Sequence, residues 1–235
     1  MPGGKIQKRE VTRKRLAKLA QNLYRTPVVT SADTCSDEFM TLRARVRAAL
    51  TVRGSRFLAE AVPVSAREEC DGVLRAVRKE YYDATHHCFA YRLGADGKQY
   101  RSSDDGEPSG TAGKPILGAI EGAGLVDVVV VVTRYFGGTK LGTGGLARAY
   151  REAAEMALGE GEHLKKYLCD ELGVTFPHAF TGPVMRAVSA AGGRIASSLY
   201  REEVHMDIEI RRSRADVLRA ALLEGTGGAV RFTGR

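Results

Sequence analysis

The fold of this chain depends on the stretch Val126–Tyr150, whose sequence is VDVVVVVTRYFGGTKLGTGGLARAY. Val126–Tyr135 is almost entirely β-branched, which predicts a central strand buried on both faces. Gly137–Gly145 contains five glycines and is expected to form a loop before a helix at about Leu146–Leu158. Because glycine has no Cβ, this loop allows the backbone to pass close to another segment or to a phosphate.

The glycine loop carries a partial dinucleotide-binding pattern, since Gly142, Gly144 and Ala147 match G-x-G-x-x-A. That fingerprint follows directly on its strand, whereas Gly142 comes seven residues after Tyr135, so no cofactor site is predicted. Cations and aromatic rings interleave around the loop, as in proteins that bind single-stranded nucleic acid. The candidate nucleic-acid or anion ligands here are Arg134, Tyr135, Gly138, Lys140, Gly142 and Arg148. The alternative is tight packing of the loop on the sheet, with the arginines paired to Asp104 and Asp105.

A second motif, SDDGEPSGTAGKP at Ser103–Pro115, places three carboxylates within four residues. These are Asp104, Asp105 and Glu107. They either hold a divalent metal through oxygen ligands or only satisfy N–H groups of an acidic turn. The sequence leaves these two interpretations open.

The same motif contains a candidate anion site, because Thr111 precedes an expected helix and Lys114 lies in its first turn. Pro108 and Pro115 stand where a phosphate-binding G-x-x-x-x-G-K-[ST] loop needs a glycine and a hydroxyl residue. That class of nucleoside triphosphatase is therefore excluded.

The strand expected at His86–Leu93 begins with two adjacent histidines. His86 and His87 point to opposite faces of a regular strand, so they cannot share one metal, and a structural role for His86 is favoured. No G-x-S-x-G motif is present. We predict no catalytic residue, cofactor or bound metal. The enzymatic alternative is a metal-assisted hydrolase or phosphotransferase that uses Asp104, Asp105, Glu107 and His86.

The positive charge is concentrated at the amino terminus. The whole chain carries +8, and residues 1–30 hold eight cations and one acid, which leaves only about +1 for the rest. Residues 1–40 are predicted to be a basic leader. Three interpretations of this leader are open. It is a mobile solvated arm, an arm that docks on RNA or on an acidic partner, or a mitochondrial presequence. Against the presequence, serine is absent before Ser31 and lysine is as common as arginine.

The cysteines and the apolar runs bear on the compartment. Cys35, Cys70, Cys88 and Cys169 form no C-x-x-C pair, which fits free thiols in a reducing compartment. The longest apolar run, Val126–Val132, is too short to span a membrane and contains Asp127. We expect a cytoplasmic protein, with a mitochondrial location as the alternative.

Two domains are expected, at residues 41–160 and 166–235, joined by a linker at Gly159–Lys166. In the first, a strand from Thr41 to Ala48 should expose three arginines, and Ser65 should cap a helix with Glu68 in a capping box. The other predicted elements of this domain are strands at Arg56–Val64, His86–Leu93 and Gln99–Ser102 and a helix at Thr111–Gly124. The second domain should have the order βαββαβ, with strands at Tyr167–Phe176, Arg194–Leu199, Val204–Arg211 and Ala229–Phe232.

The motifs together resemble the IMPACT/YigZ-like family. The matching segments are Asp83–His86, Asp104–Gly113, Arg134–Gly138 with Lys140–Gly142, and Ser55–Phe57. Gly144–Leu146 and Arg148–Tyr150 match the start of that family's last helix. The resemblance covers roughly Gly54–Leu158 densely and in order.

This resemblance implies an α+β fold. The first domain would have the left-handed βαβ fold of the second domain of small-subunit ribosomal protein five. The second would be ferredoxin-like, similar to the last domain of elongation factor G. Both relatives work on ribosomal RNA, so an RNA- or ribosome-associated translation factor is implied. Eukaryotic members restrain a translation-control kinase through a partner protein and carry an additional amino-terminal domain. The layout here resembles the bacterial-type branch instead, and a protein-interaction module remains the further alternative. The oligomeric state is not predicted.

Overall fold

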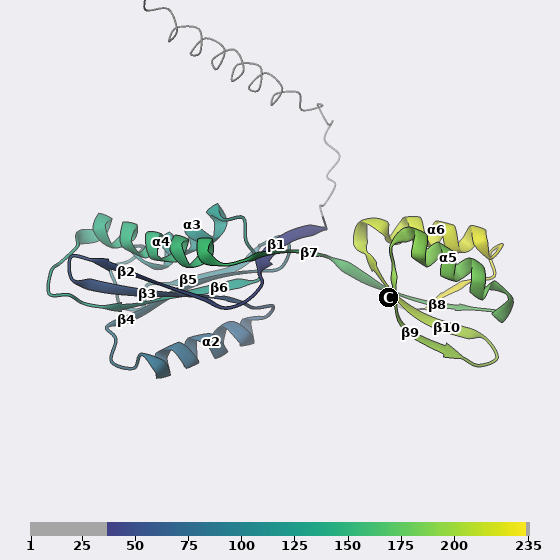
Figure 1. Cartoon of the computed structure of the whole chain (residues 1–235), viewed down its shortest axis with the longest axis horizontal. Helices are drawn as coiled ribbons and strands as arrows, with labels where there is room; N and C mark the ends of the chain where they lie inside the picture. Colours follow the sequence, from purple (N-terminus) through teal and green to yellow (C-terminus); the bar gives the residue numbers. More distant parts are fainter. Residues whose placement is uncertain (1–36, 234–235) are drawn as a thin grey trace, which may run out of the picture. The chain divides into compact units, whose positions relative to one another are not determined.

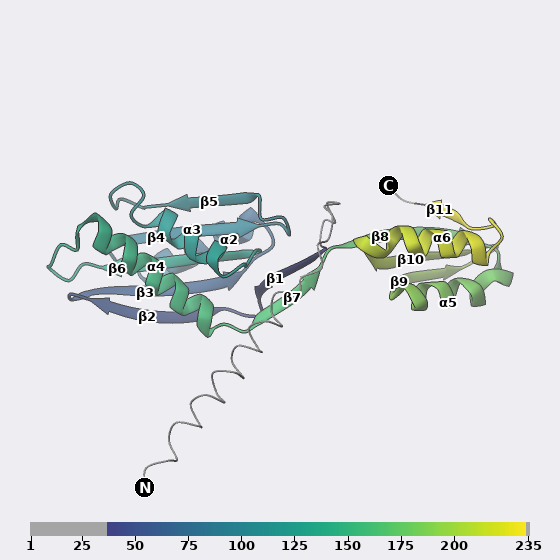
Figure 2. The ribbon, with the colours of Figure 1, turned by 90° about the horizontal axis from the view of Figure 1, so that it is seen from above.

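The computed structural model describes residues 37–233. The first domain is built on a five-stranded sheet of order β2-β3-β6-β4-β5. These strands are β2 (Val46–Val52), β3 (Ser55–Pro63), β6 (Val128–Tyr135), β4 (His86–Leu93) and β5 (Gln99–Ser103). Every neighbouring pair is antiparallel, and Figure 2 shows the strands side by side. β6 lies at the centre and is buried from Val128 to Arg134, as its β-branched sequence predicts.

Helices cover both faces of this sheet (Figure 1). The helices α3 (Gly113–Gly122) and α4 (Gly142–Glu160) share one face, and α2 (Arg67–Glu80) lies on the other. The side chains of β6 alternate between the two layers. Val128, Val130 and Val132 pack under α3 and α4, whereas Val129 and Val131 pack under α2. The strand is hydrophobic on both sides because both sides are covered.

The second domain has the predicted βαββαβ order. Its four-stranded sheet runs β11-β8-β10-β9, and every neighbouring pair is antiparallel. The elements are β8 (Cys169–Phe176), η1 (His178–Phe180), α5 (Thr181–Ala191), β9 (Arg194–Tyr200), β10 (Val204–Arg211), η2 (Arg212–Arg214), α6 (Ala215–Gly225) and β11 (Arg231–Thr233). The core of this domain lies between the sheet and the two helices. It is made of alternate residues of the strands and of the inner faces of α5 and α6. The predicted α+β class and the ferredoxin-like order are confirmed.

The predicted linker between the domains contains a strand. β1 (Glu38–Leu42) pairs antiparallel with β7 (His163–Tyr167) in a two-stranded sheet. Glu38–Met40, which the sequence placed at the end of the leader, therefore have backbone partners. Leu42 is 1% exposed, and the N–H of Val126 donates to the carbonyl of Met40 at 2.9 Å. These partners lie more than 80 residues away, which local sequence patterns do not reveal.

Several element boundaries differ from those predicted. The strand expected at Thr41–Ala48 is divided between β1 and β2, although its three arginines are exposed as expected. The Ser65 N–H and hydroxyl donate to the Glu69 carboxylate, at 2.7 and 3.1 Å, rather than to Glu68. α2 begins one residue later than the capping box implied, so the acid that faces Ser65 is shifted by one position.

The starts of two helices also differ from those predicted. α4 begins at Gly142 instead of Leu146, and α3 begins at Gly113 instead of Thr111. β11 begins at Arg231. Cys70 and Cys88 are buried free thiols and Cys169 is exposed, whereas Cys35 and residues 1–30 lie outside the described residues. No helix within residues 37–233 is long and apolar enough to cross a membrane.

Candidate functional site

Asp104 holds the loop before α3 together. Its Oδ1 accepts hydrogen bonds from the N–H groups of Ala112 and Gly113 at 2.9 and 2.8 Å, and its Oδ2 accepts one from Gly110 at 2.8 Å. Burial raises the pKa of this carboxyl, but the three backbone hydrogen bonds outweigh burial and lower the pKa below its ordinary value of 3.8. Asp104 thus supplies acceptors for the free donors at the start of the helix.

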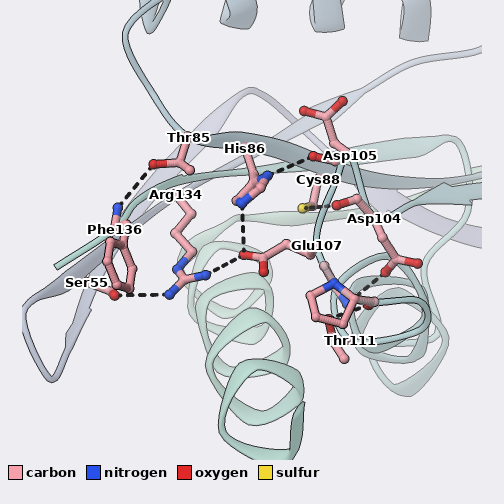
Figure 3. Close-up of polar contacts among 12 residues, drawn as sticks. Ser55, Thr85, His86, Cys88, Asp104, Asp105, Glu107, Thr111, Arg134 and Phe136 are labelled. Carbon is pink, nitrogen blue, oxygen red and sulfur yellow. Dashed lines mark hydrogen bonds and ion pairs between the residues drawn. The ribbon is translucent and has the colours of Figure 1, made fainter. Parts of the chain in front are cut away.

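Glu107 is the centre of a buried polar cluster (Figure 3). Its Oε1 accepts hydrogen bonds from Arg134 Nη1 at 2.6 Å and from the Tyr150 hydroxyl at 2.7 Å. The side chains of Arg134 and Glu107 are only 6% and 3% exposed, so this is a buried ion pair. Arg134 Nη2 also donates to the Ser55 hydroxyl at 3.2 Å, and the guanidinium lies over the rings of Phe57 and Phe136.

His86 joins the acidic loop to this cluster. Its Nδ1 lies 2.8 Å from the backbone carbonyl of Asp105, which can only accept, so Nδ1 carries the proton. Its Nε2 faces Glu107 Oε1 at 3.9 Å. The Asp105 side chain points elsewhere, accepting from Arg78 at 2.8 Å and from the His87 N–H at 2.7 Å. The predicted structural role of His86 fits these contacts.

The carboxylates of the acidic loop therefore point to different partners. Asp104 faces the start of α3, Asp105 faces α2 and β4, and Glu107 faces β6 and α4. Among residues 37–233, no three His, Cys, Asp or Glu side chains are placed to hold one metal ion. The geometry favours the scaffold interpretation of this loop over the metal interpretation.

The buried nucleophiles beside the cluster are held protonated. Burial raises the pKa of the Cys88 thiol to about 12, and that thiol donates to the Asp104 carbonyl at 3.0 Å. Burial likewise raises the pKa of Tyr150 well above its ordinary value, so its hydroxyl stays a donor to Glu107. Neither group is poised as an anionic nucleophile at neutral pH.

The three motif segments are bonded to one another at the end of β6. The Tyr135 hydroxyl donates to Asp83 at 2.8 Å, and the Phe136 N–H donates to the Thr85 hydroxyl at 3.3 Å. Beside them the chain makes a tight crossing, since a Cβ on Gly137 would lie 1.9 Å from the carbonyl carbon of Gly54. Only glycine fits there, which explains one of the glycines of the loop by packing.

The accessible cations lie around that crossing. Arg53, in the turn between β2 and β3, and Arg148, on α4, line one cleft of about 220 Å³. Lys140 is exposed on the connecting glycine segment, and Arg56 lies over the Tyr135 ring at 5.7 Å. Phe136 is 49% exposed. We refer to Arg53, Arg56, Lys140 and Arg148 as the basic turn surface.

The predicted ligands divide between this surface and the scaffold. Lys140 and Arg148 are exposed on it, and Gly138 and Gly142 are exposed with positive φ. Arg134 is buried in its ion pair, and the hydroxyl of the buried Thr111 donates to the Pro108 carbonyl at 2.6 Å. Lys114 is exposed on α3. The sequence missed Arg53, Ser55 and Tyr150, since their roles arise only from pairing between distant segments.

Comparison with known proteins shows to which family the chain belongs. The family model of the Impact N-terminal domain matches residues 53–158. The IMPACT family member YigZ of Escherichia coli (strain K12) is 33% identical over 184 residues, which cover 77% of this chain and 90% of that protein. The IMPACT family member YvyE of Bacillus subtilis (strain 168) is 30% identical over 179 residues, covering 76% and 82%. The chain belongs to the IMPACT family.

Other relatives of this IMPACT-family chain match it in part or in structure. Protein IMPACT of Oryctolagus cuniculus is 38% identical over 98 residues, which cover 40% of this chain and 30% of that protein. A crystal structure of a hypothetical protein superposes with a TM-score of 0.64 at 30% identity, covering 85% of this chain and 98% of that one. The Glu107–Arg134 cluster and the basic turn surface lie within the segment that the Impact N-terminal domain model matches.

The second domain offers a different surface. On the face of its sheet turned away from the core, β8, β10, β9 and β11 carry mostly polar and charged side chains, and Leu199 and Tyr200 at the end of β9 are exposed. Arg194 pairs there with Glu209, and Arg231 with Glu203.

Proposed function

We propose that this protein is a translation-associated factor that binds RNA through the basic turn surface of its first domain. The observation that carries the proposal is the cleft of about 220 Å³ in which Arg53 and Arg148 meet beside the glycine crossing. Two arginines from separate elements line the same cleft, although the described body of the protein is nearly neutral. Phosphate groups are the ligands that such paired arginines recognise.

The surroundings of the cleft support RNA rather than a free anion. Phe136 is half-exposed and the Tyr135–Arg56 stack lies on the neighbouring strands, so rings and cations alternate along the end of the sheet. Glu152 also lines the cleft, and its carboxylate offsets part of the positive charge of the two arginines. Because the cleft alone then attracts a small anion weakly, an extended ligand that makes further contacts outside the cleft is favoured. Base stacking and phosphate pairing together are how single-stranded nucleic acid is held.

The translational part of the proposal rests on membership of the IMPACT family and on the ferredoxin-like second domain. We infer that the RNA is ribosomal or ribosome-associated and that the protein works in the cytoplasm. The basic leader, which lies outside the described residues, would add a second electrostatic contact to the same RNA.

The test is a binding titration with a hairpin RNA that has a single-stranded tail, repeated over a series of salt concentrations. The full chain should bind with a negative slope of log affinity against log salt, and Arg148→Glu and Arg53→Glu should each flatten the slope by about one or more. Arg186→Glu, an exposed charge reversal on α5, is the matched control and should have a smaller effect. Absence of binding, or a slope near zero, contradicts the proposal.

A deletion of residues 1–30 separates the leader from the domain. If the deletion abolishes binding while Arg148→Glu does not weaken it, the leader alone binds and the basic turn surface has no such role. A pulldown from lysate with and without nuclease distinguishes the remaining alternative. Capture that survives nuclease treatment indicates a protein partner in translation control in place of RNA.

A further inference from the structure

A hollow opens on the α2 face of the first sheet, beyond the end of that helix. Three rows of paired residues lie on this face, because directly opposed residues in antiparallel strands share a face, and the cavity lies over the first two. The rows are Arg47–Glu60–Val131, Ala49–Leu58–Thr133 and Thr51–Arg56–Tyr135, taken across β2, β3 and β6. The small side chain of Ala49 leaves room in the middle row. The result is a cavity of about 190 Å³ whose rim includes Tyr81.

Two buried polar atoms at this cavity make no hydrogen bond within the described residues. Glu60 Oε1 and Thr133 Oγ1 are buried, and neither makes a hydrogen bond to any residue within 37–233. Glu60 is 4% exposed and Thr133 is 1% exposed, and both line the cavity. A buried polar group without a partner is costly, and native proteins satisfy nearly all of them. Two such atoms at one hollow indicate that a ligand completes the hydrogen bonds.

The charge of Glu60 is already balanced. Arg47 Nε donates to Glu60 Oε2 at 2.6 Å, and Arg45 Nε lies 3.3 Å from Oε1 without the angle of a hydrogen bond. The pocket therefore offers a directional acceptor and a hydroxyl; Arg47 in its lining is paired with Glu60 and Glu80, and Arg56 is exposed on the next row of the sheet. That combination suits a neutral N–H donor that is attached to an anionic chain, and it does not suit a free cation.

We propose that this cavity, hereafter the base pocket, takes a nucleobase with an exocyclic amino group from single-stranded RNA. The amino group donates to Glu60 Oε1 and a ring nitrogen accepts from the Thr133 hydroxyl, while the exposed Arg56 contacts a flanking phosphate. Carboxylates recognise the cytosine amino group in this way, and unstacked bases are the usual targets of specific RNA recognition. The inference rests on the proposed RNA-binding function.

The base pocket continues the basic turn surface. Arg56 of β3 and Tyr135 of β6 form the row nearest the β2–β3 turn, Arg53 lies in that turn, and Phe136 follows the last residue of β6. The cleft at Arg148 lies on the α4 side of the sheet and the pocket at Glu60 on the α2 side, so one strand of RNA reaches both only by passing around the β2–β3 turn. The cleft supplies charge-dependent affinity, and the pocket supplies preference between bases.

The experiment compares oligonucleotides of one length made only of cytidine or only of uridine, with adenosine as a third arm. Cytosine and uracil have the same size and phosphate charge, but uracil places a carbonyl where cytosine has its amino group, and that carbonyl faces the carboxylate. The full chain should bind the cytidine and adenosine oligomers about tenfold more tightly than the uridine oligomer. Thr133→Val should bring that ratio toward one by weakening binding of the cytidine and adenosine oligomers, and Glu60→Gln should bring it toward one by strengthening uridine binding, because the amide can donate to the uracil carbonyl.

Two controls keep the result interpretable. Glu121→Gln removes an exposed negative charge on α3, on the other face of the sheet, and should preserve the ratio. Thr133→Val removes a hydroxyl that has no partner in the free protein, so the variant should fold as stably as the original chain. The base pocket can thus be tested even if Glu60→Gln fails to fold.

If the unaltered chain binds the cytidine and uridine oligomers with equal affinity, the base pocket is contradicted. RNA binding by the basic turn surface is not contradicted by that result, and solvent then fills the hollow. A preference that neither pocket variant changes also overturns the base pocket. Absence of binding to all three oligomers overturns both the pocket and the proposed function.

Discussion

The replacement Arg134→Met tests whether this arginine builds the domain or binds its ligand. Methionine retains the apolar contacts with Phe57 and Phe136 and removes the guanidinium. It leaves the carboxylate of Glu107, whose side chain is 3% exposed, without its opposite charge. Removing one partner of a buried ion pair costs about 3–5 kcal/mol. A domain of ordinary stability has about 5–15 kcal/mol in total, so the loss is a large fraction.

Removal of all the polar partners should restore much of that stability. Glu107→Leu combined with Arg134→Met eliminates the unpaired charge, but it leaves the Tyr150 hydroxyl without its acceptor. Tyr150→Phe completes the set. Apolar replacement of a whole buried ionic cluster is often neutral or stabilising, and Arg134 Nε is already a buried donor without a partner among the described residues. The triple variant should therefore recover at least half of the loss.

The assay is urea unfolding followed by far-ultraviolet circular dichroism, together with hydrogen exchange resolved by peptide. Arg134→Met should lower the protection of β6 and α4, while peptides from β8 and β10 in the second domain serve as an internal control. An Arg134→Met protein that is as stable as the original chain but no longer binds RNA would refute the structural role. Arg134 would then belong with the ligand-binding cations.

Two further predictions concern the loops. Asp104→Asn should lower stability at pH 7 by about 1–3 kcal/mol, since the amide cannot accept all three backbone hydrogen bonds. The pKa of Asp104 is lower in the folded state than its ordinary value of 3.8. The ionised carboxylate therefore stabilises the fold fully at a pH above 3.8, and this stabilisation is lost as the pH falls through the lower pKa of the folded state. The free energies of unfolding of the original chain and of Asp104→Asn, measured by urea titration, should therefore converge in acid. Gly137→Ala should destabilise by about 1–3 kcal/mol or more through its clash with the backbone of Gly54. Gly159→Ala, in a helix with open space around the new methyl, should be neutral or stabilising in the same thermal melt.

Elements with a strong local pattern were predictable from sequence. The β-branched run gave β6, and Gly192 ends α5 in the left-handed conformation expected of a glycine there. The predicted ends of helices and strands were wrong where tertiary contacts determine where an element begins or ends. β1 and β7 have little local signal and exist because they pair with each other across the whole first domain. Thr143–Gly145 are helical despite two glycines, because Leu146, Ala149 and Tyr150 bury the face that follows.

The candidate site was predictable only in outline. The sequence grouped Asp104, Asp105 and Glu107 as one acidic feature, but the structure directs each carboxylate to a different partner. The left-handed φ of Asp105, +43°, and the glycine after it turn the chain so that neighbouring side chains diverge. Spacing along a turn does not reveal such divergence. Glu60 gave no signal at all, since a single glutamate in a strand is ordinarily exposed.

The same limit explains why sequence could not separate the arginines. Arg134 and Arg148 both lie in the glycine-rich motif, and each looks equally suited to a phosphate. Arg134 faces the layer under α4, where Glu107 reaches it from a loop 27 residues earlier, whereas Arg148 has turned outward beside Arg53. The partner that each arginine side chain meets in the fold therefore determines its role. An arginine whose charge is consumed in a buried pair orders the end of β6, and that order positions the exposed arginines to which the proposed RNA-binding function assigns the ligand.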